Sequence, residues 1–262
     1  MITKSILATL VLFSTAIGHC QDLAKVPAFE VASITPRPPG TPQSPAEHSG
    51  TEQFTFPGGG FQAKATTLKF LLEWAYDIQP SQHSPGPSWM ETDRYDIVAK
   101  AEGEATAEQN KRMVQTLLAE RFHLIFHREK KTLPVYVISL GKTAPKLFPP
   151  KQEETHSLQL VRQTNPDQKF VTYHVVATRF SLEQWANVFA RQLDRGIVNQ
   201  TGLEGAYDFT IDLTPDETRP SFLDASLLIT GMREQLGLTL KAQQLPVDFL
   251  VIDSAEKGAA GN

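Results

Sequence analysis

Two blocks of the chain show the same order of alternating and helical patterns. In each block a short alternating stretch, residues 61–67 or 171–180, predicts a strand. Apolar residues spaced three and four positions apart follow directly, as on one face of a helix. They are Leu68, Leu71, Leu72, Ala75 and Tyr76 in the first block and Leu182, Trp185, Ala186, Phe189, Ala190 and Leu193 in the second. Thr67 and Ser181 stand just before these helices as predicted N-caps.

Each block continues with a turn, a strand that opens with Tyr-Asp, a second helix and a strand that opens with Leu-Pro-Val. The Tyr-to-Pro separation is the same in both, 39 positions from Tyr95 to Pro134 and 39 from Tyr207 to Pro246. Shared order, turn chemistry and spacing predict an α+β fold made of two tandem copies of a β-α-β-α-β-β unit. We expect the helices to pack on an antiparallel or mixed sheet, and each copy to close with its own hairpin.

These patterns divide the chain into six segments. They are a signal peptide (1–20), an N-terminal strand and Pro/Gly-rich arm (21–60), a first α+β repeat (61–146), a linker (147–170), a second α+β repeat (171–257) and a tail (258–262). Prolines without N–H donors interrupt regular structure in the arm and in the linker.

The first twenty residues have the composition of an export signal. Lys4 supplies a positive charge, an uncharged stretch follows to Gly18, and small residues precede Gln21. The apolar run is too short to span a bilayer, which needs about 20 residues. We therefore expect export to the periplasm or the exterior without stable membrane insertion after cleavage. Lipidation of Cys20 is an alternative, which His19 disfavours.

Composition excludes several classes of chemistry. The formal net charge is −4 and no dense basic run is present, so nucleic acid is not an expected partner. Cys20 is the only cysteine, and cleavage after it removes disulfides, cysteine nucleophiles and Cys-ligated zinc from the mature chain. No GxSxG or GK[ST] motif occurs, and we expect no cofactor and no metal.

Several segments resemble a known exported family. FEVASITPRPPG, GPSWMETDRYDIVAKAEG, LLAERFHLIFHREKKTLPVYVISLGK and LPVDFLVIDSAEK, with two further segments in the same order, are similar to domain of unknown function 3738, which is abundant in soil acidobacteria. The resemblance implies an exported protein, attached in some relatives to a membrane metallopeptidase of the antibiotic-sensor type. It brings no assigned reaction, and this chain lacks their HExxH motif.

Four residues are candidate contacts for a ligand or partner. Trp89 lies in the Pro/Gly-containing stretch 84–93, which has no counterpart before Tyr207, and Arg94 follows it. His123 and His127 have metal-like spacing, but alternation over residues 122–127 predicts a strand, in which the two rings lie on one face but too far apart for easy shared ligation. The paired Tyr-Asp motifs are better explained by aspartates that accept backbone N–H groups than by carboxylate catalysis.

The sequence thus predicts a non-enzymatic exported protein that binds a cell-envelope protein or ligand. A hydrolase of unfamiliar design that uses His123 and His127, and a sensory ectodomain with a separate membrane metallopeptidase, are the alternatives.

Overall fold

The computed structural model describes residues 26–38, 40–41, 54–151, 156–164, 171–191, 193–215 and 225–257, which form an α+β fold. The strands are β1 (Val31–Pro36), β2 (Phe54–Thr55), β3 (Phe61–Thr67), β4 (Arg94–Lys100), β5 (Ile125–Leu140), β6 (Ser157–Gln163), β7 (Thr172–Phe180), β8 (Gly196–Asn199), β9 (Tyr207–Leu213) and β10 (Leu238–Ser254). The helices are α2 (Leu68–Ala75), α3 (Trp89–Thr92), α4 (Ala107–Phe122), α5 (Leu182–Ala190) and α6 (Ala225–Gln235), with 3-10 turns η1 (Pro57–Gly59) and η2 (Pro80–Gln82). The predicted signal and tail lie outside the described residues.

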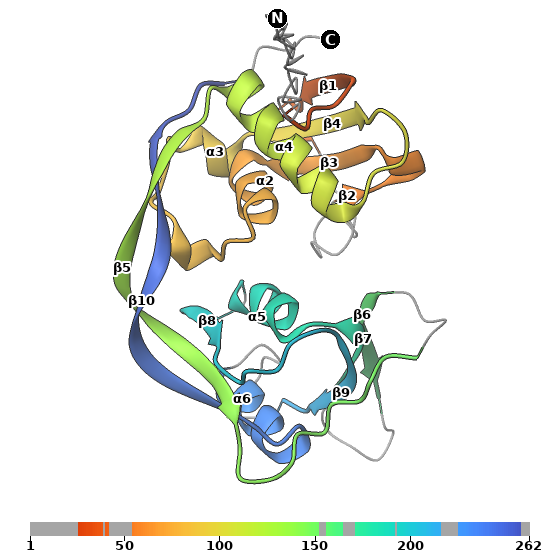
Figure 1. The fold of residues 1–262 in the computed structure, drawn as a ribbon, viewed down its shortest axis with the longest axis vertical. Helices are drawn as coiled ribbons and strands as arrows, with labels where there is room; N and C mark the ends of the chain where they lie inside the picture. The colour runs from red at the N-terminus through yellow and green to blue at the C-terminus, as the bar shows by residue number, and fades with distance from the viewer. Residues whose placement is uncertain are drawn as a thin grey trace, which may run out of the picture.

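The first lobe contains an antiparallel sheet in the order β1-β4-β3-β2. Helices α2 and α4 pack their apolar sides against this sheet, where Leu71, Ile97 and Leu118 are fully buried. Figure 1 shows α4 lying across the strands. The N-terminal segment predicted at residues 21–60 therefore supplies β1 and β2 to this sheet.

The second lobe contains the sheet β6-β7-β9, with α5 and α6 in the same core. Trp185 is completely buried there, as its place on the apolar helix face predicts, and its ring lies 4.0 Å from that of Phe189. Phe148 adds an isolated antiparallel bridge to Asp208 beside β9. The segment predicted as a linker at 147–170 thus contributes β6 and this bridge.

A long two-stranded ribbon joins the lobes (Figure 1). The predicted hairpin at the end of each copy is wrong, because β5 and β10 each run without a turn through Pro134 or Pro246 and pair with each other antiparallel. The start of β5 and the end of β10 pack on the first core, while the end of β5 and the start of β10 pack on the second. Each lobe therefore completes its core with a strand segment from both sequence blocks.

The two blocks share local features, although the second has strand β8 where the first has η2 and α3. Thr67 and Ser181 accept the backbone N–H of Phe70 and Gln184, which confirms both predicted N-caps. Strands β3 and β7 each carry a bulge just before the cap, with a positive φ of 49° at Ala65 and 51° at Arg179.

The aspartates of the two Tyr-Asp motifs hold these bulges. Asp96 accepts the N–H of Ala65 and Asp208 accepts that of Arg179, both at 2.8 Å. The prediction that these carboxylates serve backbone N–H groups is confirmed, although the groups belong to strand bulges and not to turns or helix ends. In the ribbon, Leu133 lies opposite Leu245, its counterpart at the shared offset of 112 positions.

Candidate functional site

Two hollows stand out in the described part of the chain, and the larger of the two lies at the edge of the first sheet. It has a volume of about 820 Å³. We call it the arm pocket, and its lining residues are Pro36, Arg37, Pro38, Gly40, Thr41, Thr92, Asp93, Arg94, Tyr95 and Lys257. Residues of the Pro/Gly-rich arm, the stretch before β4 and the C-terminal segment meet there. Two regions that the sequence singles out thus share one opening.

Ion pairs organise the walls of the arm pocket. Arg37 Nε donates to Asp96 Oδ2 at 3.0 Å, and Lys257 Nζ lies 2.6 Å from Asp93 Oδ2. Arg94 Nη1 donates to the carbonyl of Ala65 at 2.7 Å, so the cation rests on the bulge of β3. The pocket therefore presents three cationic side chains, of which Arg94 begins β4, Arg37 pairs with Asp96 and Lys257 pairs with Asp93. Cationic side chains at an opening suit a polar or acidic partner group.

Tyr95 forms the buried floor of this pocket and is 2% exposed. Burial raises the pKa of its phenol, and the negative charge of Asp93 raises it further. The ring also packs edge-on against Phe122 at 5.3 Å, which fixes the start of β4 to the core. The phenol is therefore a neutral structural group at physiological pH.

Trp89 lies in a different setting from the one predicted. The stretch 84–93 is not a continuous loop, because Trp89 begins the short helix α3. Its indole is partly buried and stacks on Phe122, with ring centroids 6.5 Å apart and planes inclined at 21°. This packing attaches the segment with Thr92 and Asp93, which line the arm pocket, to the core of the first lobe.

His123 and His127 do not share a strand face. The predicted strand over residues 122–127 is wrong at its start, because α4 runs to Phe122 and His123 caps it in the left-handed conformation, with φ of 44°. His123 Nδ1 lies 3.2 Å from Glu256, and His127 Nδ1 lies 2.9 Å from Asp253. Each exposed ring therefore has its own carboxylate.

The contacts that the C-terminal segment makes with these residues were not predicted from the sequence. Asp253, Glu256 and Lys257 contact His127, His123 and Asp93 respectively. The Glu256 N–H also donates to the carbonyl of Phe122 at 2.8 Å. No pattern within one block could indicate these contacts, because they depend on the pairing of β5 with β10.

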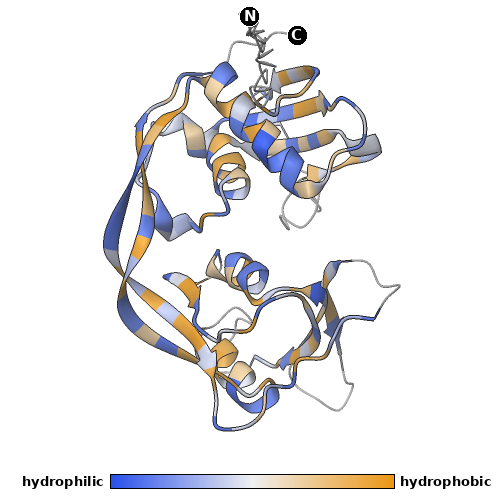
Figure 2. Ribbon diagram, in the orientation of Figure 1, coloured by the Kyte–Doolittle hydropathy of each residue, from blue (hydrophilic) through white to orange (hydrophobic). Residues whose placement is uncertain are grey.

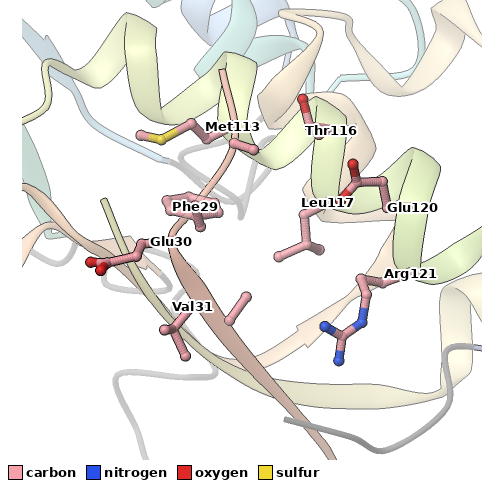
Figure 3. Close-up of a pocket in the computed structure, with 10 residues that line it drawn as sticks. Phe29, Glu30, Val31, Met113, Thr116, Leu117, Glu120 and Arg121 are labelled. Carbon is pink, nitrogen blue, oxygen red and sulfur yellow. The ribbon is translucent and has the colours of Figure 1, made fainter. Parts of the chain in front are cut away.

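A second hollow of about 310 Å³ separates the chain before and along β1 from α4. Figure 3 shows Phe29 on one side and Leu117 on the other, with Glu120 and Arg121 at the rim. Its lining mixes apolar side chains with Glu30, Thr116, Glu120 and Arg121, and its volume is at the lower limit for small-molecule sites. The arm pocket remains the better candidate.

A further polar cluster lies where the lobes touch, and it was not predicted from the sequence. Glu73 and His83 of the first lobe are buried beside Arg191 of the second. Glu73 is a charged residue on an otherwise apolar helix face, which was the one available signal.

Elsewhere in the described ranges, no group of three or more His, Cys, Asp or Glu side chains is arranged to hold a metal ion. Among these same residues no helix combines the length and apolar character that crossing a bilayer requires.

Comparison with known proteins gives a family but no activity. No curated protein and no solved structure matches the chain. One family model, described as protein of unknown function (DUF3738), matches residues 69–255, which include both lobes and the ribbon. Because that match covers well over half of the sequence, the chain belongs to the DUF3738 family.

Proposed function

We propose that this chain is a non-enzymatic, extracytoplasmic interaction protein that binds a cell-envelope partner at the arm pocket. The observation that carries the proposal is convergence: the Pro/Gly-rich arm, the segment after Trp89 and Arg94 line one opening. Sequence features that occur in only one block mark a site better than features that occur in both, because the shared ones maintain the fold.

Comparison of the two blocks supports this choice. We infer that the blocks arose by duplication, since the bulge-holding aspartates are 112 positions apart and the matched caps and bulges are both 114 positions apart. The offset from Tyr95 onward is 112 positions. At that offset Arg94 corresponds to Ala206 and Trp89 to Thr201, so the second lobe lacks both candidate contact side chains. The first twenty residues have the composition of an export signal. An exported chain would meet its partner in the cell envelope.

Charge favours a partner with acidic or other hydrogen-bond-accepting groups. Arg37, Arg94 and Lys257 contribute three positive charges to the lining, and Asp93 contributes one negative charge. Guanidinium groups bind carboxylates with two parallel hydrogen bonds, which gives both attraction and orientation. The partner need not bury a large apolar surface for such recognition.

Site-directed photo-crosslinking tests the proposal. A photoreactive amino acid replaces exposed Thr92 in the full-length exported chain, in envelopes of the native host. The matched control carries it at exposed Glu204, the position 112 residues later. We expect one adduct from the Thr92 variant that excess unlabelled wild-type protein competes away, and that Lys257→Glu weakens at least several-fold.

The outcomes separate the alternatives. Identical adducts from Thr92 and Glu204, or none from either, would refute the arm pocket as the contact surface. Turnover of a cell-wall substrate that is lost in His123→Ala would support the hydrolase instead. A membrane metallopeptidase in the Thr92 adduct would identify the partner as that of a sensory ectodomain.

A further inference from the structure

The two lobes meet through a small polar junction apart from the ribbon. On the first lobe it consists of α2 and η2, and on the second of α5 and β8, which face each other in Figure 1. Glu73 is the central residue, with a side chain that is 2% exposed. A buried carboxylate needs compensating partners, because burial without them costs several kcal/mol.

Glu73 finds its partners on both sides of the junction. One carboxylate oxygen, Oε1, lies 3.1 Å from His83 Nε2 in its own lobe, and the other, Oε2, accepts from Arg191 Nη1 of the second lobe. The other nitrogen of the imidazole, Nδ1, lies 2.8 Å from the carbonyl of Ser84, so the ring is held at both ends. Arg191 also stacks over Phe70 at 4.5 Å. The cluster is therefore complete only while the lobes touch.

Gln79 makes a second polar contact across the same junction. Its side-chain amide donates from Nε2 to the carbonyl of Ile197 and accepts the Ile197 N–H at Oε1, both at 2.7 Å. This pair of bonds imitates a neighbouring strand at the outer edge of β8. Nε2 also donates to Asn187 at 3.0 Å. Separation of the lobes would leave the edge of β8 uncovered.

The ribbon between the lobes has the features of a hinge. Residues 127–132 of β5 and 241–244 of β10 are exposed, although most residues paired with them, such as Val137 and Val247, are buried; Figure 2 shows many hydrophilic residues along the ribbon. Pro134 and Pro246 each remove one ladder donor near its centre. Apolar packing in this middle part is limited to a small cluster of Val135, Val137 and Val247, and β8 pairs only with residues 135–138 of β5. A ribbon with so little packing can bend, so the contacts at the junction determine how the lobes are oriented.

We infer that Glu73, His83, Arg191 and Gln79 form a latch that holds the two lobes together, and that the exposed ribbon is the hinge on which they open. Opening breaks the shared cluster and frees the edge of β8 for another strand. Every group in the latch is polar, so water can satisfy each one after separation. A wholly apolar junction would not be reversible in this way.

Distance measurement between the lobes tests the latch. In a Cys20→Ser background, spin labels are attached to cysteines at exposed Glu104 and Thr210, one in each lobe, and double electron–electron resonance gives their distance distribution. We expect one narrow distance in the otherwise unchanged chain. Glu73→Gln and Arg191→Met should each raise the population of longer distances by about tenfold, since each leaves a partly buried charge without its partner.

A wedge at the junction provides a test that leaves all charges in place. A Cβ at Gly196 would lie 2.7 Å from Ser81 Oγ and 2.8 Å from Gln79 Oε1, so Gly196→Ala should also open the lobes. Glu108→Gln is the matched control, because Glu108 forms only an exposed ion pair with Arg112 at 3.7 Å. It should leave the distribution unchanged.

The results decide the inference in either direction. Broadened distances in Glu73→Gln and Gly196→Ala, with unchanged near-ultraviolet circular dichroism, support a latch between intact lobes. The same narrow distance in all variants would overturn it, as would opening in Glu108→Gln. If Glu73→Gln unfolds the first lobe, the Gly196→Ala distribution alone decides.

Discussion

Removal of the aspartate that binds a strand bulge should lower the stability of the protein more in the first lobe than in the second. Asp96 Oδ1 accepts the N–H of Ala65, a residue that is 1% exposed and has a positive φ of 49°. Asp208 makes the same bond to Arg179, but in an exposed setting. Without its carboxylate, the N–H of buried Ala65 is less accessible to water than that of exposed Arg179, although the Asp96 side chain itself is 37% exposed.

The magnitudes follow from hydrogen-bond energetics. A bond to a charged acceptor that leaves a buried donor unsatisfied contributes about 2–3 kcal/mol, and an exposed one about 0.5–1.5 kcal/mol. For a chain of this size each kcal/mol changes the melting temperature by about 2–4 °C. We expect Asp96→Ala to lower it by about 4–12 °C and Asp208→Ala by about 1–6 °C. Loss of the partly exposed Arg37 pair adds little.

Differential scanning calorimetry of both variants measures this difference, and Asp96→Asn serves as the conservative control. Asparagine keeps an oxygen acceptor for the Ala65 N–H, so it should retain more than half of the stability that alanine loses. Tryptophan fluorescence assigns the transition, since Trp74 and Trp89 lie in the first lobe and Trp185 in the second. If Asp208→Ala proves as costly as Asp96→Ala, the argument from burial is refuted.

Two further predictions concern pH and backbone geometry. Burial raises the pKa of Tyr76, against a smaller opposing effect of Arg128, and it also raises that of Tyr95. The folded state thus favours both neutral phenols, and this stabilisation is present below the ordinary pKa of 10.0 and lost as pH rises through the folded value. Ultraviolet titration should show two phenols that ionise at higher pH than the others, and one of these two should be absent in Tyr76→Phe. Phenols that all ionise over the same pH range would contradict this. Gly59→Ala should lower the melting temperature more than Gly58→Ala, because both have positive φ but only Gly59 would place its Cβ against backbone, 2.5 Å from a nitrogen; equal losses would refute the clash.

Local features of the fold were predictable because they depend on neighbours in the chain. The helix N-caps at Thr67 and Ser181 were correct, since a cap is defined by residues within one turn. The burial of Trp185 followed from its place on an apolar helix face. The Tyr-Asp motifs indicated a shared role in binding backbone N–H groups, and the structure adds that these groups belong to bulges.

The pairing of strands was not predictable in the same way. The Leu-Pro-Val triplet that both strands share does not indicate whether each strand pairs within its own block or with its equivalent in the other. Only the tertiary structure shows the exchange, in which Leu133 faces Leu245. The contacts of His123, His127 and Lys257 with the C-terminal segment follow from that exchange.

The sequence by itself determined most helices and strands of each block and the two regions that line the arm pocket, but not β8 or the single long strand that replaces each predicted hairpin. This was possible because caps, amphipathic faces and turns depend on residues that are close together in the chain. The tertiary structure decided which strands pair and which charges meet, since Glu73 and Arg191 are 118 positions apart and come together only through folding. Long-range contacts of this kind leave no periodic pattern in a single sequence.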